Sequence, residues 1–236
     1  MKRFLSSSIA LVAFIVLLPV MLAVSVAIFI ELRQMPVYTS VRVGKNWKKF
    51  KIYKFRTMKK GADRLLANLH SMNTYLRLEG HTIEEKVTFQ SNDYLYADNY
   101  KVREDVYLSE RHKCFEGCFI KIENDPRITK LGKFLRKTSL DELPQLINII
   151  KGDMCIVGNR PLSTDEAELL TTDDDGLRFK ASAGLTGLWQ TDPRKDDMPP
   201  SERIRLDNLY AEKESLSYDI KLIFATVKKV IQGSNG

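Results

Sequence analysis

Residues 124–162 read NDPRITKLGKFLRKTSLDELPQLINIIKGDMCIVGNRPL, and the rest of the chain is organised around this stretch. Two carboxylates, Asp141 and Glu142, stand side by side at its centre. Arg136 precedes them, and Arg160 follows about a helix and a loop later. Adjacent carboxylates between arginines suit a site that handles phosphate with a metal ion or a nucleophile. This stretch is therefore the candidate functional site.

The residues around the two carboxylates also predict the start of a helix. Ser139 and Glu142 fit a capping box, in which both side chains bind free amides at a helix start. Pro144 is tolerated in a first turn, so we expect a helix that begins near Ser139 to Asp141 and runs to Ile150. A purely structural alternative stays open, in which Glu142 only caps the helix and Asp141 only balances its dipole.

Four separate blocks of the chain resemble one known protein family. They are KIYKFRTM at residues 51–58, LRKTSLDELPQLINIIKGDM at 135–154, VGNRPL at 157–162 and GLTGLWQ at 184–190. In this order they are similar to the bacterial sugar transferases. These are monotopic phosphoglycosyl transferases, which move a phosphosugar from a nucleotide sugar to polyprenyl phosphate. Four blocks in the right order are far more specific than any one of them.

The resemblance implies an enzyme, a sugar-1-phosphate transferase that uses a UDP-sugar, polyprenyl (undecaprenyl) phosphate and Mg²⁺. By family precedent, Asp141 attacks the sugar-bearing β-phosphate and expels UMP, and the lipid phosphate then takes the phosphosugar. Glu142, with Asp141, would hold the metal, while Arg160 and Arg136 would contact phosphate. We expect this positive setting to keep Asp141 ionised. Such a transfer is the first membrane step in making an exopolysaccharide, capsule, lipopolysaccharide or other glycoconjugate.

The expected fold is α+β and mainly helical. Residues 1–34 are predicted to form a re-entrant (or single) membrane helix. Residues 35–236 are predicted to form a small cytosolic catalytic domain with a short β-hairpin, interfacial amphipathic helices and an insertion at about 61–123. No chemistry is assigned to the insertion, and the sequence leaves open whether the chain forms homo-oligomers.

The membrane prediction rests on residues 9–30, an uncharged apolar run of about 22 residues that is long enough to cross a bilayer. Pro19 lies at its middle, where it removes a helical hydrogen bond and bends the helix. Basic residues flank the run on both sides, so neither end is expected to leave the cytoplasm. This fits a helix that enters one leaflet of the inner membrane, breaks at Pro19 and returns to the cytoplasmic face. A straight, kinked span is the alternative.

Two residues depart from the family pattern. Leu18 stands where a serine usually precedes the membrane proline, so the hydroxyl that would help satisfy the broken backbone is missing. Asn159 stands where a proline usually gives the following loop its rigidity. These departures support a second candidate function, a membrane-associated scaffold or regulator with the same fold and no turnover. Retention of Asp141, Glu142 and Arg160 argues against it.

Residues Tyr38–Met58 predict a β-hairpin with a turn at Gly44–Asn46. From Arg42 to Lys60 the chain carries nine basic residues and no acidic one. Beside a membrane segment, such a run indicates contact with anionic lipid. Lys54 and Arg56 match the family motif KFRTM, and we expect them to contact substrate phosphate.

Composition limits the partners of this chain of 236 residues. Its net charge of +7 and pI near 9.2 indicate an anionic partner: lipid headgroup, nucleotide or nucleic acid. We expect no nucleic-acid binding, because the basic cluster adjoins the membrane segment and carries no nucleic-acid fold signature. Cys114, Cys118 and Cys155 are too few for a disulfide framework, and His112 with the first two lacks a second pair for zinc.

The C-terminal third predicts one strand and two helices. Cys155–Pro161 is typical of a buried strand that enters a tight loop, and Gly184–Gln190 either shapes a nucleotide or sugar pocket or forms a packed turn. One helix is expected from Ser201 to Glu214 and another from Ser217. The second carries an apolar stripe that either packs on the core or lies among lipid headgroups: Leu216, Ile220, Ile223, Phe224, Val227 and Ile231. Asp207 and Asp219 are interpreted as solvated or structural.

Overall fold

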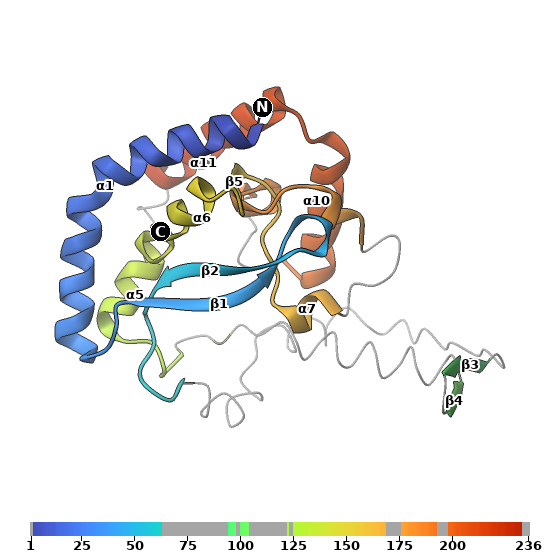
Figure 1. Ribbon diagram of the computed structural model, residues 1–236, viewed down its shortest axis with the longest axis horizontal. Coiled ribbons are helices and arrows are strands. Elements are labelled where there is room, and N and C mark those ends of the chain that lie inside the picture. Colours follow the sequence, from blue (N-terminus) through green and yellow to red (C-terminus); the bar gives the residue numbers. More distant parts are fainter. Residues whose placement is uncertain are drawn as a thin grey trace. The chain divides into compact units, whose positions relative to one another are not determined.

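The computed structural model describes residues 2–62, 94–97, 100–103, 122, 125–168, 176–192 and 198–232. The chain divides into two units, Met1–Arg64 with Pro126–Gly236, and Leu65–Asp125. The described part of the first unit is mainly helical, as the sequence predicts, and it contains two small sheets (Figure 1). Of the second unit only the antiparallel hairpin β3 (Tyr94–Ala97) and β4 (Tyr100–Arg103) and residue 122 are described, together with Asp125. Most of the predicted insertion, with His112, Cys114 and Cys118, lies outside the described residues.

Helix α1 (Lys2–Leu32) contains Pro19 near its middle. Figure 1 shows α1 as two arms that meet at a bend. A proline gives no N–H to the carbonyl four residues earlier, and its ring crowds that carbonyl, which accounts for a bend in this helix. Among the described residues, α1 is the one helix long and apolar enough to cross a membrane.

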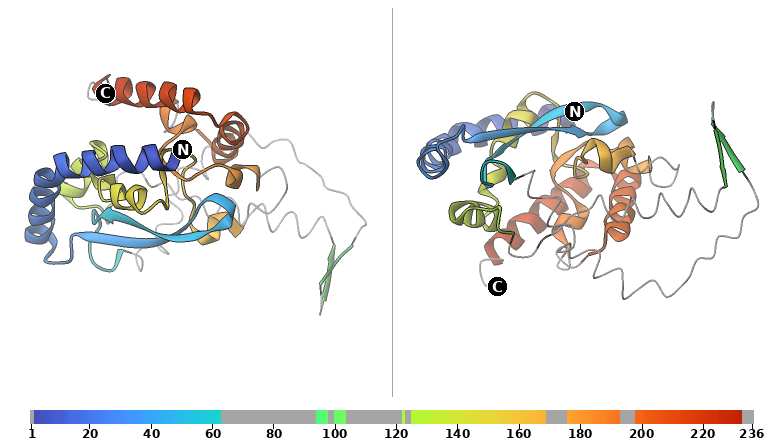
Figure 2. Two further views of the ribbon diagram at one scale, coloured as in Figure 1. Left: turned by 45° about the horizontal axis from the view of Figure 1, so that its top comes forward. Right: turned by 90° about the horizontal axis from the view of Figure 1, so that it is seen from below.

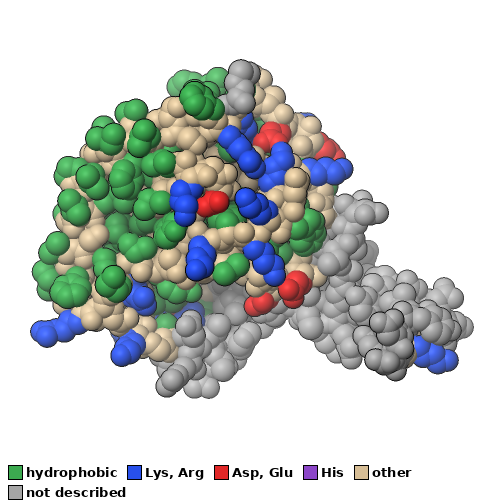
Figure 3. All heavy atoms as spheres, in the orientation of Figure 1, with side chains coloured by type: hydrophobic (Ala, Val, Ile, Leu, Met, Phe, Trp, Pro, Cys, Tyr) green, Lys and Arg blue, Asp and Glu red, His purple; other side chains and the backbone are tan. Residues whose placement is uncertain are grey.

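One face of α1 packs on the rest of the unit. Ala10 lies in a buried cluster with Ile52 and Ile149, and the hydroxyl of Ser7 donates a hydrogen bond to the Ile149 carbonyl oxygen at 2.8 Å. Farther along the helix, Met21 and Ile28 join a second buried cluster with Phe55 and Leu135. The outward face keeps its large apolar side chains exposed, and Figure 3 shows such side chains gathered over α1. These include Phe4, Ile9, Val12, Ile15, Val16, Leu22, Val26, Phe29 and Ile30.

The predicted hairpin is confirmed. β1 (Val37–Val43) and β2 (Lys49–Phe55) pair antiparallel, with Val43 opposite Lys49 and Val37 opposite Phe55. The turn between them contains a short 3-10 helix, η1 (Lys45–Trp47). The exposed tip of the turn is fixed by Trp47, whose ring stacks on that of Phe179 with the centroids 3.9 Å apart.

The carboxylate stretch folds differently from the prediction. Helix α5 (Lys130–Lys137) ends before Ser139, a 3-10 turn η3 (Leu140–Glu142) follows, and α6 begins only after Pro144 and spans Gln145–Ile150. The capping box is wrong, because Ser139 has a left-handed backbone (φ 57°) and its side chain makes no cap hydrogen bond. Pro144 explains the interruption: inside a continuous helix its ring would clash with the carbonyl of residue 140.

Asn148 fastens α6 to the hairpin. Its side chain is fully buried. It makes hydrogen bonds to the edge of β2 that faces away from β1, where a further strand would otherwise pair. The amide Nδ2 donates to the Lys51 carbonyl oxygen at 2.7 Å, and the Oδ1 accepts a hydrogen bond from the Tyr53 N–H at 3.0 Å. Since an unpaired strand edge leaves backbone groups unsatisfied, one side chain here replaces a third strand.

A second small sheet confirms the predicted strand at Cys155. β5 (Cys155–Val157) pairs in parallel with β6 (Gly184–Thr186). The chain between them contains α7 (Thr164–Glu168) and the 3-10 helix η4 (Leu177–Lys180). The two strands approach closely because glycine stands at Gly158 and Gly184, where an added Cβ would lie within 2.2 Å of backbone atoms. The GLTGLWQ motif is therefore part strand, and part the short helix α9 (Leu188–Thr191) that follows.

Two C-terminal helices complete the unit, α10 (Pro200–Lys213) and α11 (Leu216–Gln232). Their predicted caps are wrong: Pro199 precedes α10, so Ser201 lies inside it, and the N–H of Tyr218 donates to the hydroxyl of Ser215, before α11. Both views in Figure 2 place the C-terminal end of α11 at the edge of the unit. The apolar stripe of α11 is exposed at Ile220, Phe224 and Val227, whereas Leu222, which lies outside the stripe, is buried.

Asp219 is structural rather than solvated. Its side chain accepts a hydrogen bond from the hydroxyl of Tyr210 at 2.6 Å and pairs with the Lys2 ammonium at 2.9 Å. Lys2 also pairs with Glu214 at 2.6 Å. The first turn of α1 is thereby tied to both C-terminal helices.

The clamp formed by Asn148 predicts a large effect on stability. We expect Asn148→Ala to lower the free energy of unfolding by about 2–4 kcal/mol, because it leaves two partly buried backbone groups of β2 unpaired. Urea unfolding in detergent, followed by circular dichroism, measures the change. Lys51→Ala is the control, since it removes an exposed side chain of the same strand and keeps the carbonyl that Asn148 uses. Equal free energies of unfolding for the two variants would show that the hydrogen bonds of Asn148 to β2 do not stabilise the fold.

Candidate functional site

A cleft of about 290 Å³ opens where the hairpin, the turn η3, the start of α6 and the loop after β5 meet. Charged and polar residues from all of these segments line it together with glycine and apolar residues. Figure 3 shows basic side chains around an acidic one on this face of the molecule. The lining residues are Arg42, Ile52, Lys54, Glu142, Gln145, Arg160, Pro161, Gly184, Leu185 and Gln190.

An ion pair crosses the cleft between the hairpin and η3. The Lys54 ammonium lies 2.7 Å from Glu142 Oε1, with about a quarter of each side chain exposed (23% and 27%). Glu142 therefore has a partner 88 residues away instead of the expected capping contact with Ser139. The structural alternative for Glu142, a cap alone, is wrong.

The environment shifts the pKa values of the two carboxylates in opposite directions. Burial alone would raise the pKa of Glu142, but the charges of Lys54 and Arg160 outweigh it, so the pKa is lowered. The Lys54 pair therefore stabilises the fold above the usual glutamate pKa of 4.5, and this contribution is lost as the pH falls through the lowered value. The pKa of Asp141 is raised, because burial and the adjacent Glu142 outweigh Lys54 and Arg136. Lys54 and Arg136 lower the pKa of Asp141, as expected, but burial and Glu142 raise it by more.

Arg160 lies beside the pair from the opposite wall of the cleft. Its guanidinium is 6.0 Å from the centre of the Trp189 ring, and its charge contributes to lowering the pKa of both Glu142 and Lys54. For Lys54, burial is the larger cause. The loop of Arg160 follows β5, and the indole belongs to α9, so the VGNRPL and GLTGLWQ motifs meet here.

The other predicted phosphate-binding residues are engaged elsewhere. The Nε of Arg136 donates to the Thr57 hydroxyl at 3.0 Å, and its charge acts on Asp141. The Nε of Arg56 donates to the Met35 carbonyl oxygen at 3.1 Å, and the guanidinium lies 5.8 Å from the centre of the Tyr38 ring. The structure thus brings Lys54, Glu142 and Arg160 together, with Asp141 adjoining. Asp141, Arg136 and Arg56 are not among the described residues that line the cleft.

Sequence reasoning missed Arg42 as a residue of the cleft. The basic run as a whole predicts contact with lipid, but Arg42 is half-buried and its guanidinium lies 3.5 Å from Glu166. Burial lowers the pKa of Arg42, and the charge of Glu166 opposes this shift. Nothing in the basic run distinguishes Arg42 from its neighbours, because the distinction arises from the packing of α7 on β1.

The two carboxylates are also the candidate metal ligands. The described residues contain no cluster of three or more histidine, cysteine, aspartate or glutamate side chains. Mg²⁺ commonly binds through one or two carboxylates together with water and substrate phosphates. Asp141 and Glu142 therefore suit an ion shared with a phosphorylated substrate more than a closed structural site.

Comparison with known proteins identifies the family. The model of the family described as bacterial sugar transferase matches residues 1–233. The chain belongs to the bacterial sugar transferase family. The resemblance carried by the four sequence blocks is thereby confirmed.

Several curated relatives of this bacterial sugar transferase are similar over most of the chain. It is 36% identical to the undecaprenyl-phosphate galactose phosphotransferase of Salmonella typhimurium, over 83% of this chain and 33% of that protein. It is 35% identical to the galactosyl transferase CpsE of Streptococcus agalactiae, over 84% of this chain and 35% of that protein. The exopolysaccharide production protein ExoY of Sinorhizobium fredii is 35% identical over 97% of this chain and 84% of its own length. The chain thus spans about a third of the first two relatives and most of the third.

The ion pair in the cleft predicts the titration of both carboxylates. Replacing Lys54 with methionine removes a cation that lowers the pKa of Glu142 and of Asp141, so both values should rise. A pH titration followed by NMR of ¹³C-labelled aspartate and glutamate carboxyls, assigned by substitution, measures this. Lys51→Met is the control, because Lys51 is an exposed residue of the same strand. Unchanged titration in Lys54→Met would show that the pair does not set these pKa values.

Proposed function

We propose that this chain transfers a phosphosugar from a UDP-sugar to polyprenyl (undecaprenyl) phosphate and releases UMP. The observation that carries the proposal is the cleft, in which Glu142 is paired with Lys54 at 2.7 Å beside Arg160, next to Asp141. The printed names of relatives support the substrates. One is an undecaprenyl-phosphate galactose phosphotransferase, and another, from Escherichia coli, is a UDP-glucose:undecaprenyl-phosphate glucose-1-phosphate transferase. The second is 42% identical over 45% of this chain and 24% of its own length.

Asp141 is the proposed nucleophile. Its carboxylate oxygen forms a bond to the β-phosphorus of the UDP-sugar, the bond from that phosphorus to the bridging oxygen breaks, and UMP leaves. An oxygen of the lipid phosphate then attacks the same phosphorus, and the bond to Asp141 breaks to give a polyprenyl diphosphate sugar. Two steps let a soluble and a lipid substrate use one small site in turn.

The neighbouring charges assist both steps. Lys54 and Arg160 are placed to neutralise charge that builds on the phosphoryl oxygens. Glu142, with Asp141, would hold Mg²⁺, which when bound supplies further neutralisation of the phosphate. Burial and Glu142 raise the pKa of Asp141, whereas the charges of Lys54 and Arg136 oppose this shift and favour its reactive, ionised form.

The first helix is proposed to hold the cleft at the cytoplasmic face of the inner membrane. The exposed apolar side chains on α1 and its bend support a re-entrant helix more than a straight span. The exposed Ile220, Phe224 and Val227 of α11 suit a helix that lies among lipid headgroups. A polyprenyl phosphate acceptor would present its phosphate at this same level.

The two departures from the family pattern weigh little in favour of an inactive scaffold. Asn159 is buried, and its Nδ2 donates to the carbonyl oxygens of Arg178 and Asp207, both at 2.9 Å. These bonds fix the loop where a proline would otherwise restrict it. Leu18 belongs to α1, which runs from Lys2 to Leu32 through Pro19 and bends (Figure 1), so the helix bends without the serine hydroxyl.

Asp141→Asn tests the nucleophile. The amide is nearly isosteric but is a poor nucleophile, so we expect UMP release to fall by more than about 10³-fold. The assay combines the full-length protein in detergent or nanodiscs with a panel of UDP-sugars, polyprenyl phosphate and Mg²⁺. Asp165→Asn, an exposed change, is the control. Normal turnover by Asp141→Asn would refute the assignment, and absence of turnover by the wild type across the panel would favour the scaffold.

Glu142→Ala separates a catalytic role from a structural one. We expect UMP release to fall by about 10²-fold or more, because metal and phosphate lose a ligand, while the loss of a partly exposed ion pair lowers the thermal unfolding temperature only slightly. Glu168→Ala, an exposed glutamate in α7, should change neither quantity. Full activity of Glu142→Ala would mean that Glu142 serves the fold alone.

A further inference from the structure

Arg178 and Asp207 form an ion pair inside the protein. The guanidinium Nη2 lies 2.7 Å from Asp207 Oδ2, and only 3% and 1% of the two side chains is exposed. Arg178 belongs to η4 and Asp207 to the middle of α10. Neither is among the described residues that line the cleft with Glu142. The pair therefore does not contact a phosphate bound at the proposed site.

Stability alone is a weak reason for such a pair. Removing two charges from water is costly, and apolar residues of similar volume often serve the fold as well or better. Burial raises the pKa of Asp207 to about 6, against the charges of Arg178, Arg160 and Arg203. A carboxyl whose pKa is higher in the folded chain than the usual 3.8 lowers stability as the pH rises toward neutrality. At neutral pH, ionisation of the buried Asp207 therefore lowers the free energy of unfolding.

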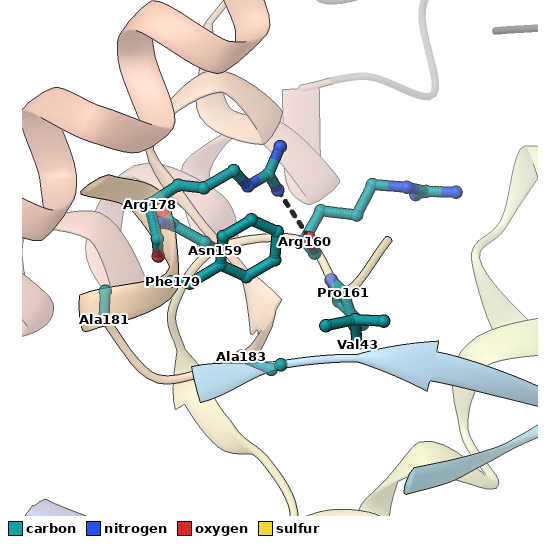
Figure 4. A pocket seen from close by; sticks show the side chains of 9 residues that line it. Val43, Asn159, Arg160, Pro161, Arg178, Phe179, Ala181 and Ala183 are labelled. Atoms are coloured by element: carbon teal, nitrogen blue, oxygen red, sulfur yellow. Dashed lines mark hydrogen bonds between the residues drawn. The ribbon is translucent and has the colours of Figure 1, made fainter. Parts of the chain in front are cut away.

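The pair contacts the backbone of Arg160. The same Nη2 of Arg178 donates a hydrogen bond to the carbonyl oxygen of Arg160 at 2.7 Å. Figure 4 shows this bond, and it shows the Arg160 side chain leading away from Arg178. Arg178 thus fixes the Arg160 carbonyl, while the Arg160 guanidinium extends on the other side toward Trp189 and the cleft.

Asn159 closes the network one residue earlier. Besides the bonds of its amide to the carbonyl oxygens of Arg178 and Asp207, its backbone N–H donates to the Ser182 carbonyl oxygen at 2.9 Å. Its own carbonyl oxygen accepts from the Gly184 N–H at 2.9 Å. The backbone on the N-terminal side of Arg160 is therefore fixed by η4, α10 and β6 together.

We propose that Arg178, held by Asp207, is a positioning residue that fixes the direction in which Arg160 enters the cleft. The proposal rests on the proposed function, in which Arg160 neutralises the phosphate of the donor. A flexible loop would let the guanidinium move by an ångström or more, and misplacement of that size costs up to about 10²-fold in rate. The hydrogen bonds of Arg178, Asp207 and Asn159 make the backbone at Arg160 rigid. In the family pattern, a proline at position 159 contributes this rigidity.

The principal test replaces the pair by apolar residues of similar volume, Arg178→Met with Asp207→Leu. We expect the thermal unfolding temperature to be retained or raised, because the buried charges are removed together. We expect kcat/KM for UMP release to fall about 10- to 100-fold, because the Arg160 carbonyl loses its donor. Arg205→Met is the control, since it breaks an exposed pair with Glu202 on the same helix and should change neither quantity.

The same replacement in an Arg160→Ala background shows whether the effect passes through Arg160. If Arg178 acts by positioning, the replacement should cost less than about 3-fold there, since interacting residues are not additive. An equal loss in both backgrounds, or no loss in the wild-type background, would overturn the proposal. If the double replacement does not fold, Asp207→Asn, which keeps shape and an acceptor oxygen, is tested in the same cycle against the same criterion.

Tryptophan emission distinguishes failure of this proposal from failure of the proposed function. The chain has two tryptophans, so Trp47→Phe leaves Trp189, whose ring lies 6.0 Å from the Arg160 guanidinium and 4.7 Å from that of Arg203. Arg203→Met in the same background separates the contribution of Arg203 to the emission from that of Arg160. We expect Arg178→Met with Asp207→Leu to shift the Trp189 emission in the direction that Arg160→Ala does. Unchanged emission would refute the positioning role whatever the activity. A shifted emission in this variant, together with a wild-type protein that releases no UMP, would instead refute the proposed function.

Discussion

The fold depends on two hydrogen bonds by which one asparagine completes a sheet. Asn148 binds the free edge of β2 through its carbonyl and amide, and this fixes α6 against the hairpin. The turn η3 immediately precedes α6, so the same contact sets Glu142 opposite Lys54. α1 packs on α6 as well, through Ser7 and Ala10. The apolar helix and the basic hairpin thus both pack on α6, which the acidic turn directly precedes.

The charges of the cleft follow from this arrangement. A lysine at the end of a strand and a glutamate in a tight turn are held 2.7 Å apart, so Glu142 is kept ionised although it is largely buried. For Asp141, burial and the neighbouring charge of Glu142 outweigh the cations, so its pKa is raised. Two adjacent carboxylates therefore acquire different properties, which is what a nucleophile and a metal ligand require. Behind the cleft, the buried Arg178 and Asp207 supply order to the loop that carries Arg160.

Much of this could be predicted from the sequence, because the decisive signals are local or repeat known motifs. Alternation of apolar residues predicts the hairpin, and the apolar run at Cys155 predicts β5. The grouping of Asp141, Glu142 and Arg160 follows from their motifs. By contrast, the alternating pattern of the strand predicts that Lys54 and Arg56 point to the same side, but only Lys54 lines the cleft. β2 ends at Phe55, so Arg56 has already left the strand and turns to Met35.

Other features depend on contacts between distant residues, which a local pattern does not contain. Asn148 looks like an ordinary helical residue until β2, 95 residues earlier, lies against it. The sequence leaves Asp207 either solvated or structural, and only its buried pair with Arg178 shows that it is structural. The capping box failed for a local reason that the pattern did include: Pro144 interrupts the helix that Ser139 was expected to cap.

The most direct test of the central claim is peptide mass spectrometry of the full-length protein mixed with a UDP-sugar that it turns over, without polyprenyl phosphate. The account predicts a phosphosugar bound to Asp141, which disappears when polyprenyl phosphate is added. An adduct on a different residue, or UMP release that requires both substrates and leaves no adduct, would contradict it.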